Sequence, residues 1–174
     1  TLVSTVIPPT FHGNKIPTVR VFDEKGSRTI GNDTQLYLCA TWNSYVLDYL
    51  IRMRVTTTLN FFYLYQLPVP RLTEKDAAFR PIVERAVRLI CTTPEFDELA
   101  KEIFGEPATA MSVGAPDPAE RAKLRAELDG LVAHLYGLTE EEFAHILTTF
   151  PLVSDEVKIA AHNAFRNVER GLVK

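Results

Sequence analysis

The pattern of hydrophobic and polar positions changes about 72 residues into the chain. Before that point, short runs rich in β-branched and aromatic residues alternate with polar, glycine-containing turns, which is typical of strands. The runs predicted as β elements are TLVSTVIPP, TVRVF, QLYLCA and LNFFYLYQLPV. The first of them ends at Pro8-Pro9, because proline has no N–H to donate to a ladder.

One helix interrupts this strand-like part. Asn43 can cap it, and the apolar residues that follow recur with a period of 3.6 residues between positions 46 and 51. Arg52 and Arg54 then lie at its C-terminal end, where cations suit the helix dipole.

From Thr73 onward the pattern predicts helices with explicit start signals. The predicted starts are Arg80-Pro81, Thr93-Pro94, Asp117-Pro118-Ala119-Glu120, the capping box of Thr139 with Glu142, and Ser154. The segment near 105–117 has the composition of a flexible linker. We therefore expect an α+β fold, with a small β-containing subdomain over residues 1–72 and a helical region over residues 73–174.

The composition is that of an ordinary globular protein. The chain has 174 residues, of which 46% are hydrophobic and 24% charged, so it can bury a hydrophobic core without needing disulfides or bound metal ions for stability. Its longest apolar stretches are broken by Asp48, Arg52, Arg54 and Gln66, and no membrane span is predicted. Cys39 and Cys91 lie 52 positions apart, which favours free buried thiols and a cytoplasmic location.

The chain starts without methionine and without a signal-peptide pattern, so we expect a piece of a longer protein. Its two parts differ in the sign of their charge. Residues 1–72 hold seven Lys or Arg against four acids, a net charge of +3, and residues 73–174 hold twelve against eighteen, a net charge of −6. The first part suits a polyanionic partner and the second does not.

The sequence contains no recognisable catalytic motif. The sequence has no nucleophile elbow, no phosphate-binding glycine loop, no HExxH and no Cys/His cluster, so no catalytic residue and no metal ligand is predicted. The carboxylates of the helical region are predicted to form solvated faces. Of the four histidines, His12 stands apart because it lies in a polar loop, where recognition residues are common. The aromatic run NFFYLYQL can either fill a core or stack on bases.

Three fragments of the middle of the chain carry a resemblance to a known family. They are Asn43-Ser44 with Arg52, Asn60-Phe61-Phe62, and Leu67-Pro68-Val69-Pro70. In this order they resemble the C-terminal specificity domain of TaqI-type adenine-specific DNA methyltransferases and of single-chain type II restriction-modification enzymes. LRAELDGLVAHLYGLTEEEFAHILTTFPLV is similar to the C-terminal ending of such enzymes, so the resemblance covers most of residues 34–153.

The resemblance implies a target-recognition module that reads double-stranded DNA for a site-specific adenine methyltransferase. The module itself is expected to be non-catalytic, and the parent enzyme can be with or without a fused endonuclease. S-adenosylmethionine is expected in a missing upstream domain, because neither the Phe-x-Gly-x-Gly loop nor the Asn-Pro-Pro-(Tyr/Phe) motif occurs in this chain. The implied partners are duplex DNA and that upstream methyltransferase domain or a catalytic subunit. The recognition domain of this family is commonly longer than the part before Pro70, so it is expected to be truncated at its N-terminus.

DNA recognition requires cations that contact phosphates, and it requires polar groups that read the edges of bases. The candidates for phosphate contact are Lys15, Arg20 and Arg28, and those for base reading or positioning are His12, Asn14, Arg52, Arg54 and Asn60. Structural roles remain open for several of them: Arg52 and Arg54 can satisfy helix carbonyls, and Asn60 can hold a turn.

A second hypothesis is a protein-interaction or scaffold module whose helices dock a methylase or nuclease core. Leucines recur at helical spacing between Leu124 and Leu135, which suits such docking and equally suits an internal core.

Overall fold

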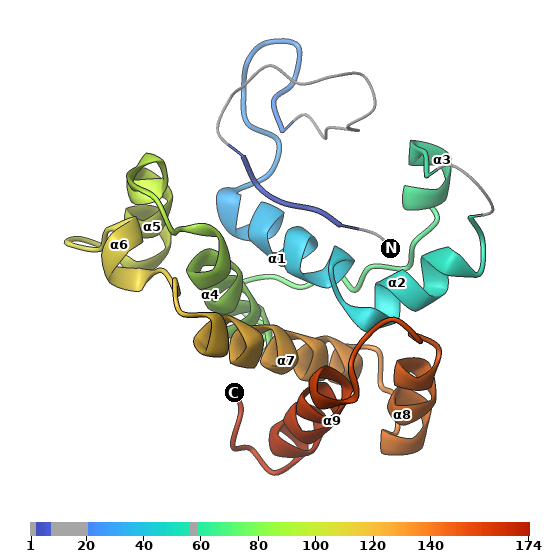
Figure 1. Ribbon diagram of the computed structural model, residues 1–174. Coiled ribbons are helices and arrows are strands. Elements are labelled where there is room, and N and C mark those ends of the chain that lie inside the picture. The colour runs from blue at the N-terminus through green and yellow to red at the C-terminus, as the bar shows by residue number, and fades with distance from the viewer. Residues whose placement is uncertain (1–2, 8–20, 56–58) are drawn as a thin grey trace.

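The structure, a computed structural model, describes residues 3–7, 21–55 and 59–174. These residues are predominantly helical, and the helices pack into one body from which the turn near residues 21–30 stands out (Figure 1). The helices are α1 (Asn32–Trp42), α2 (Tyr45–Arg52), α3 (Phe61–Leu64), α4 (Phe79–Ile90), the 3-10 helix η1 (Pro94–Phe96), α5 (Asp97–Phe104), α6 (Ala110–Val113), α7 (Pro118–Leu135), α8 (Glu140–Thr148) and α9 (Asp155–Glu169).

The expected α+β fold is wrong. Among the described residues there is no sheet, and the β-type pairing found there is an isolated bridge between Phe22 and Arg28. The predicted strand QLYLCA lies within α1, and NFFYL forms the start and body of α3. Short apolar runs of this kind fit a buried helix as well as a buried strand, and α1 buries Leu36, Tyr37 and Cys39 in the core.

The junction between α1 and α2 also differs from its prediction. Ser44, and not Asn43, is the N-cap of α2, and its hydroxyl accepts a hydrogen bond from the Leu47 N–H at 3.3 Å. Asn43 is the C-cap of α1. Its side-chain amide holds the extended N-terminal segment, accepting from the Ser4 N–H at 3.0 Å and donating to the Ser4 carbonyl at 2.8 Å.

The helix starts predicted after Thr73 are confirmed where their caps are explicit. The Asp117 carboxylate accepts the Glu120 N–H at 2.8 Å at the start of α7. Thr139 and Glu142 form the predicted capping box of α8. The segment 105–117 contains α6, and Ala110 and Ala115 within it are buried.

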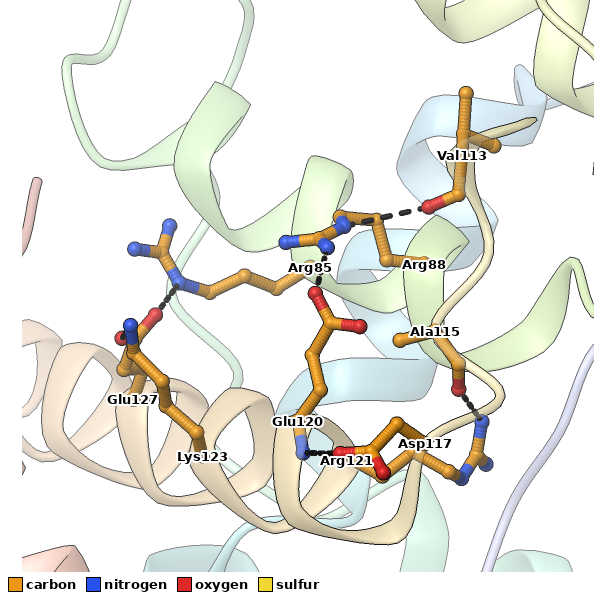
Figure 2. Close-up of polar contacts among 9 residues, drawn as sticks. All are labelled: Arg85, Arg88, Val113, Ala115, Asp117, Glu120, Arg121, Lys123 and Glu127. Carbon is orange, nitrogen blue, oxygen red and sulfur yellow. Dashed lines mark hydrogen bonds and ion pairs between the residues drawn. The ribbon is translucent and has the colours of Figure 1, made fainter.

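Helix α7 lies at the centre of the helical body, between α4 and α9 (Figure 1). Ion pairs join it to α4: Arg85 Nε lies 2.7 Å from Glu127 Oε2, with both side chains mostly buried, and Arg88 pairs with Glu120 (Figure 2). The buried Arg85–Glu127 pair mainly fixes geometry, because desolvation offsets much of its attraction. With the more exposed Arg88–Glu120 pair, it holds α7 against α4.

On its other side α7 approaches α9 so closely that only glycine fits at position 130. A Cβ there would lie 2.8 Å from both the Ala164 carbonyl carbon and the Phe165 nitrogen, which are backbone atoms of α9. The neighbouring core residues Val132 and Phe165 are fully buried. None of the described helices is both long and apolar enough to cross a membrane.

We predict that Gly130→Ala destabilises the chain although alanine is the better helix former. The collision with the α9 backbone outweighs the gain in helix propensity and leaves a net loss of about 1–2 kcal/mol in the free energy of unfolding. Urea unfolding followed by circular dichroism measures it. Asn163→Ala, on the exposed face of α9, is the matched control and should change little; an unchanged stability for Gly130→Ala would contradict the close packing of α7 on α9.

Candidate functional site

The eight candidate DNA-contacting residues fall into three groups. His12, Asn14, Lys15 and Arg20 lie outside the described residues. Arg28 lies in the turn that stands out from the helical body (Figure 1). Arg52, Arg54 and Asn60 lie near one another in sequence, around the end of α2 and the start of α3.

Arg28 is exposed and belongs to a tightly held turn. The Asp23 carboxylate accepts hydrogen bonds from the Lys25 and Ser27 N–H groups at 2.9 and 2.8 Å, and Gly26 has φ of +79°, which favours glycine. The guanidinium of Arg28 lies 5.5 Å from the centre of the Phe22 ring. The turn thus presents an arginine to solvent on an ordered backbone.

Arg52 has structural contacts at the end of α2. Its Nε lies 3.2 Å from Asp48 Oδ2, and its guanidinium lies 4.3 Å from the centre of the Phe150 ring. Guanidinium groups stack favourably on aromatic faces. Arg52 therefore ties α2 to the segment that follows α8.

Arg54 and Asn60 lie where α2 gives way to α3. Arg54 Nη1 donates to the Gln66 carbonyl at 2.9 Å, so the arginine attaches the end of α3 to the end of α2. Asn60 is the exposed N-cap of α3, and its side chain makes no capping bond. The aromatic run is therefore a short helix and not the predicted strand with two faces.

Helix α3 buries none of its residues and lies at the edge of the helical body (Figure 1). Phe62 is 65% exposed and Tyr65 is 81% exposed, whereas Phe61 stacks on Tyr65 with ring centres 5.7 Å apart. Residues three apart share one side of a helix. Phe62, Tyr65 and Arg54 together form what we call the aromatic–basic surface.

The segment after α3 is held to the core by two tyrosines. Tyr136 donates to the Pro68 carbonyl at 2.7 Å, and Tyr37 donates to the Pro70 carbonyl at 2.8 Å. Burial raises the pKa of both phenols. The Leu67–Pro70 motif therefore serves as an anchor for α3.

A cavity of about 850 Å³ lies among α1, α2, α4, α7 and α9. Its polar lining includes Tyr45 and Asp48 from the first turn of α2, and Arg121, Arg125 and Asp129 from α7. Asp129 Oδ1 accepts the Tyr45 N–H at 2.9 Å, so a carboxylate of α7 caps the N-terminus of α2.

The carboxyl of Asp129 sits in an environment that disfavours its charge. The residue as a whole is only partly buried. Burial of its carboxyl raises the pKa to about 7, and the hydrogen bond from the Tyr45 N–H lowers the pKa by a smaller amount. Burial and the nearby Asp129 and Asp48 charges together raise the pKa of Tyr45 to about 12. Sequence reasoning missed Asp129, because its partner lies 84 positions away and a single acid in a helix carries no signal.

Two histidines of the helical region, His134 and His162, have side-chain contacts. The His134 ring stacks on Phe165 at 4.1 Å between centres, and its Nε2 lies 3.0 Å from the Phe165 carbonyl oxygen. His162 Nε2 lies 3.3 Å from Glu140 Oε1. Within the described ranges no group of His, Cys, Asp or Glu could hold a metal ion.

The comparisons with known proteins identify no relative. No protein-family model, no curated protein and no solved structure matches this chain.

We predict that the difference in free energy of unfolding between the wild type and Asp129→Asn depends on pH. A carboxyl whose pKa is raised on folding binds more protons in the folded state, so its contribution is largest below about pH 4 and is lost as the pH rises to about 7. Asp129→Asn keeps an oxygen to accept the Tyr45 N–H but cannot titrate. The free energy of unfolding of the wild type relative to this variant should therefore fall over that window and level off above it.

Urea unfolding across the window measures this difference, with Asp155→Asn on the exposed start of α9 as the matched control. A difference that rises with pH would show that the Asp129 carboxyl is stabilised as an anion and would contradict the account of the cavity.

Proposed function

We propose that this chain is the DNA-contacting C-terminal part of a site-specific DNA adenine methyltransferase of restriction-modification type. The observation that carries the proposal is the aromatic–basic surface: α3 exposes Phe62 and Tyr65 beside Arg54 although large aromatic side chains are normally buried. Exposed aromatic rings flanked by arginine suit contact with bases and phosphates.

Two further features support DNA as the partner. The exposed Arg28 and Lys25 belong to the part of the chain with the positive net charge, and they lie on an ordered turn. Of the fragments that carry the resemblance to adenine methyltransferases, Asn60-Phe61-Phe62 forms the start of α3, and Leu67-Pro68-Val69-Pro70 anchors that helix. Methyl transfer and S-adenosylmethionine binding belong, in this proposal, to an upstream domain.

The division of labour follows from the chemistry of each group. Arg28 and Arg54 contact phosphates, which supplies affinity without sequence information. Phe62 and Tyr65 press apolar rings against base steps, as aromatic and aliphatic wedges do when a duplex is locally unstacked. Adenine methylation requires the target base to leave the stack, so rings that stabilise a distorted duplex serve that reaction.

A second function, docking of a methylase or nuclease core, is favoured by apolar side chains exposed on the helical region. Leu152 is 99% exposed in the connection between α8 and α9, and Ile159 on α9 is 59% exposed. Such residues contribute to protein contacts when they gather in a patch. This function is compatible with the first, because a recognition module must also attach to its catalytic domain.

Binding to a random-sequence duplex is expected to be steeply salt-dependent, and Arg28→Ala should reduce the slope of log affinity against log salt by about 1. Fluorescence anisotropy at several salt concentrations measures the slope. Lys123→Ala is the matched control, since that lysine is 75% exposed but lies on α7 in the acidic part of the chain. Equal slopes for wild type and Arg28→Ala would remove Arg28 from the interface, and affinity independent of salt would contradict the proposal.

Tyr65→Ala should weaken duplex binding about tenfold while leaving the salt slope unchanged, because it removes a stacking ring and no charge. Tyr65→Phe keeps the ring and should bind like the wild type. The same anisotropy titration at one salt concentration measures both. If the two variants bind equally well, the exposed ring of α3 does not contact DNA.

A further inference from the structure

The cavity between α2 and α7 contains a carboxyl group that lacks an ionic partner. Asp129 accepts one hydrogen bond, from the Tyr45 N–H, and no cation among the described residues lies within ion-pair distance of it. Buried carboxylates in proteins are normally paired with a cation or supplied with several hydrogen-bond donors. The space beside Asp129 is open, since the residue lines a cavity of about 850 Å³.

A second carboxylate that lines the same cavity, Asp48, shows how such a group is satisfied. Asp48 holds Arg52 at 3.2 Å, and the guanidinium lies 4.3 Å from the centre of the Phe150 ring. The Phe150 ring in turn meets the Tyr45 ring edge-on, with centres 4.8 Å apart. A carboxylate and an aromatic ring therefore bind a cation supplied by the chain itself, and next to them lie a second carboxylate and a second ring.

We propose that this cavity binds an organic cation, an ammonium or guanidinium group carried on an apolar body, with the Asp129 carboxylate and the Tyr45 ring around the cationic head. The inference does not depend on DNA binding. An aromatic face and a carboxylate in a partly desolvated site attract such a cation more strongly than either does in water.

The rest of the lining fits an apolar body. Small and apolar side chains from α1, α4, α7 and α9 surround the polar groups, among them Ala40, Ala86, Ala126 and Ala161, and the volume is that of an ordinary small-molecule site. Alanines leave room beside the helices that larger residues would fill. A ligand with an aliphatic chain can therefore bury it while its head reaches Asp129.

Other charged groups also face the cavity and shape its selectivity. On α7, Arg121 donates to the Leu89 and Ala115 carbonyls at 2.9 and 3.0 Å, as Figure 2 shows for Ala115. Arg125, one turn before Asp129, makes no ion pair with a described residue, and Glu156 lines the cavity from α9. With Asp48 and Arg52 of α2, these residues carry a formal charge of +1, and an ionised Asp129 brings the cavity lining to zero. Attraction of a cation therefore has to come from Asp129 itself and not from a general negative field.

The test uses a series of probes that share one aliphatic chain. Hexylamine is cationic at neutral pH, hexan-1-ol is neutral and hexanoate is anionic, and each is titrated into the ¹⁵N-labelled chain at constant ionic strength. The amide resonance of Tyr45, whose N–H contacts Asp129, reports occupancy. We expect hexylamine to bind at least about tenfold more tightly than hexan-1-ol, as charge-assisted contacts predict, and hexanoate to bind more weakly than either.

Variants localise the interaction. Asp129→Asn retains an acceptor for Tyr45 and should reduce hexylamine affinity about tenfold, to that of hexan-1-ol. Glu156→Gln removes a carboxylate that lines the same cavity from α9 and should leave the affinity unchanged. Equal binding of hexylamine and hexan-1-ol to the wild type, or equal losses in the two variants, would overturn the proposal.

A second measurement does not depend on the variants folding. Carboxyl ¹³C resonances of the wild type give the pKa of Asp129 with and without hexylamine, and a bound cation must lower it; an unchanged pKa at saturating probe would overturn the proposal. To distinguish a free amine from a polypeptide side chain, a capped Leu-Lys-Leu peptide is compared with its norleucine analogue. Lysine-dependent peptide binding that exceeds hexylamine binding identifies a protein ligand, and the reverse order identifies a small amine.

Discussion

The hydrogen bond from the Tyr45 N–H to the Asp129 carboxylate attaches the N-terminal part of the chain to the helical region. The positions of both the cavity lining and the aromatic–basic surface depend on this attachment. It fixes the start of α2 on α7. Helix α2 then carries Asp48 and Arg52 toward Phe150, and Arg54 beyond its end attaches α3 through the Gln66 carbonyl. The Asp129 carboxyl, whose pKa is raised to about 7, therefore links the packed helices to the segment that carries the exposed aromatic rings.

Helix α2 therefore connects two kinds of surface. The first turn of α2 faces the cavity, where groups are desolvated and charges interact strongly. The C-terminal end leads to α3, which is anchored by Tyr37 and Tyr136 through the proline segment. Tyr63 and Leu64 of α3 pack half-buried against the core, and no residue of α3 is fully buried. A rigid anchor below exposed rings is suited to recognition, because little conformational freedom is lost on binding.

The amino-acid sequence predicts much of the helical region and little of what precedes it. Asp117 and Thr139 cap their helices through local bonds, and local bonds are visible in sequence. By contrast, α1 was expected to be a strand, because it is apolar on several sides and lies buried between the N-terminal segment, α4 and α7. The aromatic helix α3 was missed because its four residues are too few to show a helical period, and Asp129 because its partner is distant along the chain. The placement of Arg52 on Phe150 likewise depends on a contact between residues almost one hundred positions apart.

The central claim, that the N-terminal part of this chain contacts duplex DNA through the turn and α3, is tested most directly by mapping amide chemical-shift changes of the labelled chain as duplex is added at low salt. We expect the largest changes in residues 21–30 and 53–66, with α7, α8 and α9 little affected. Changes confined to α7–α9, or no changes at low salt, would contradict it.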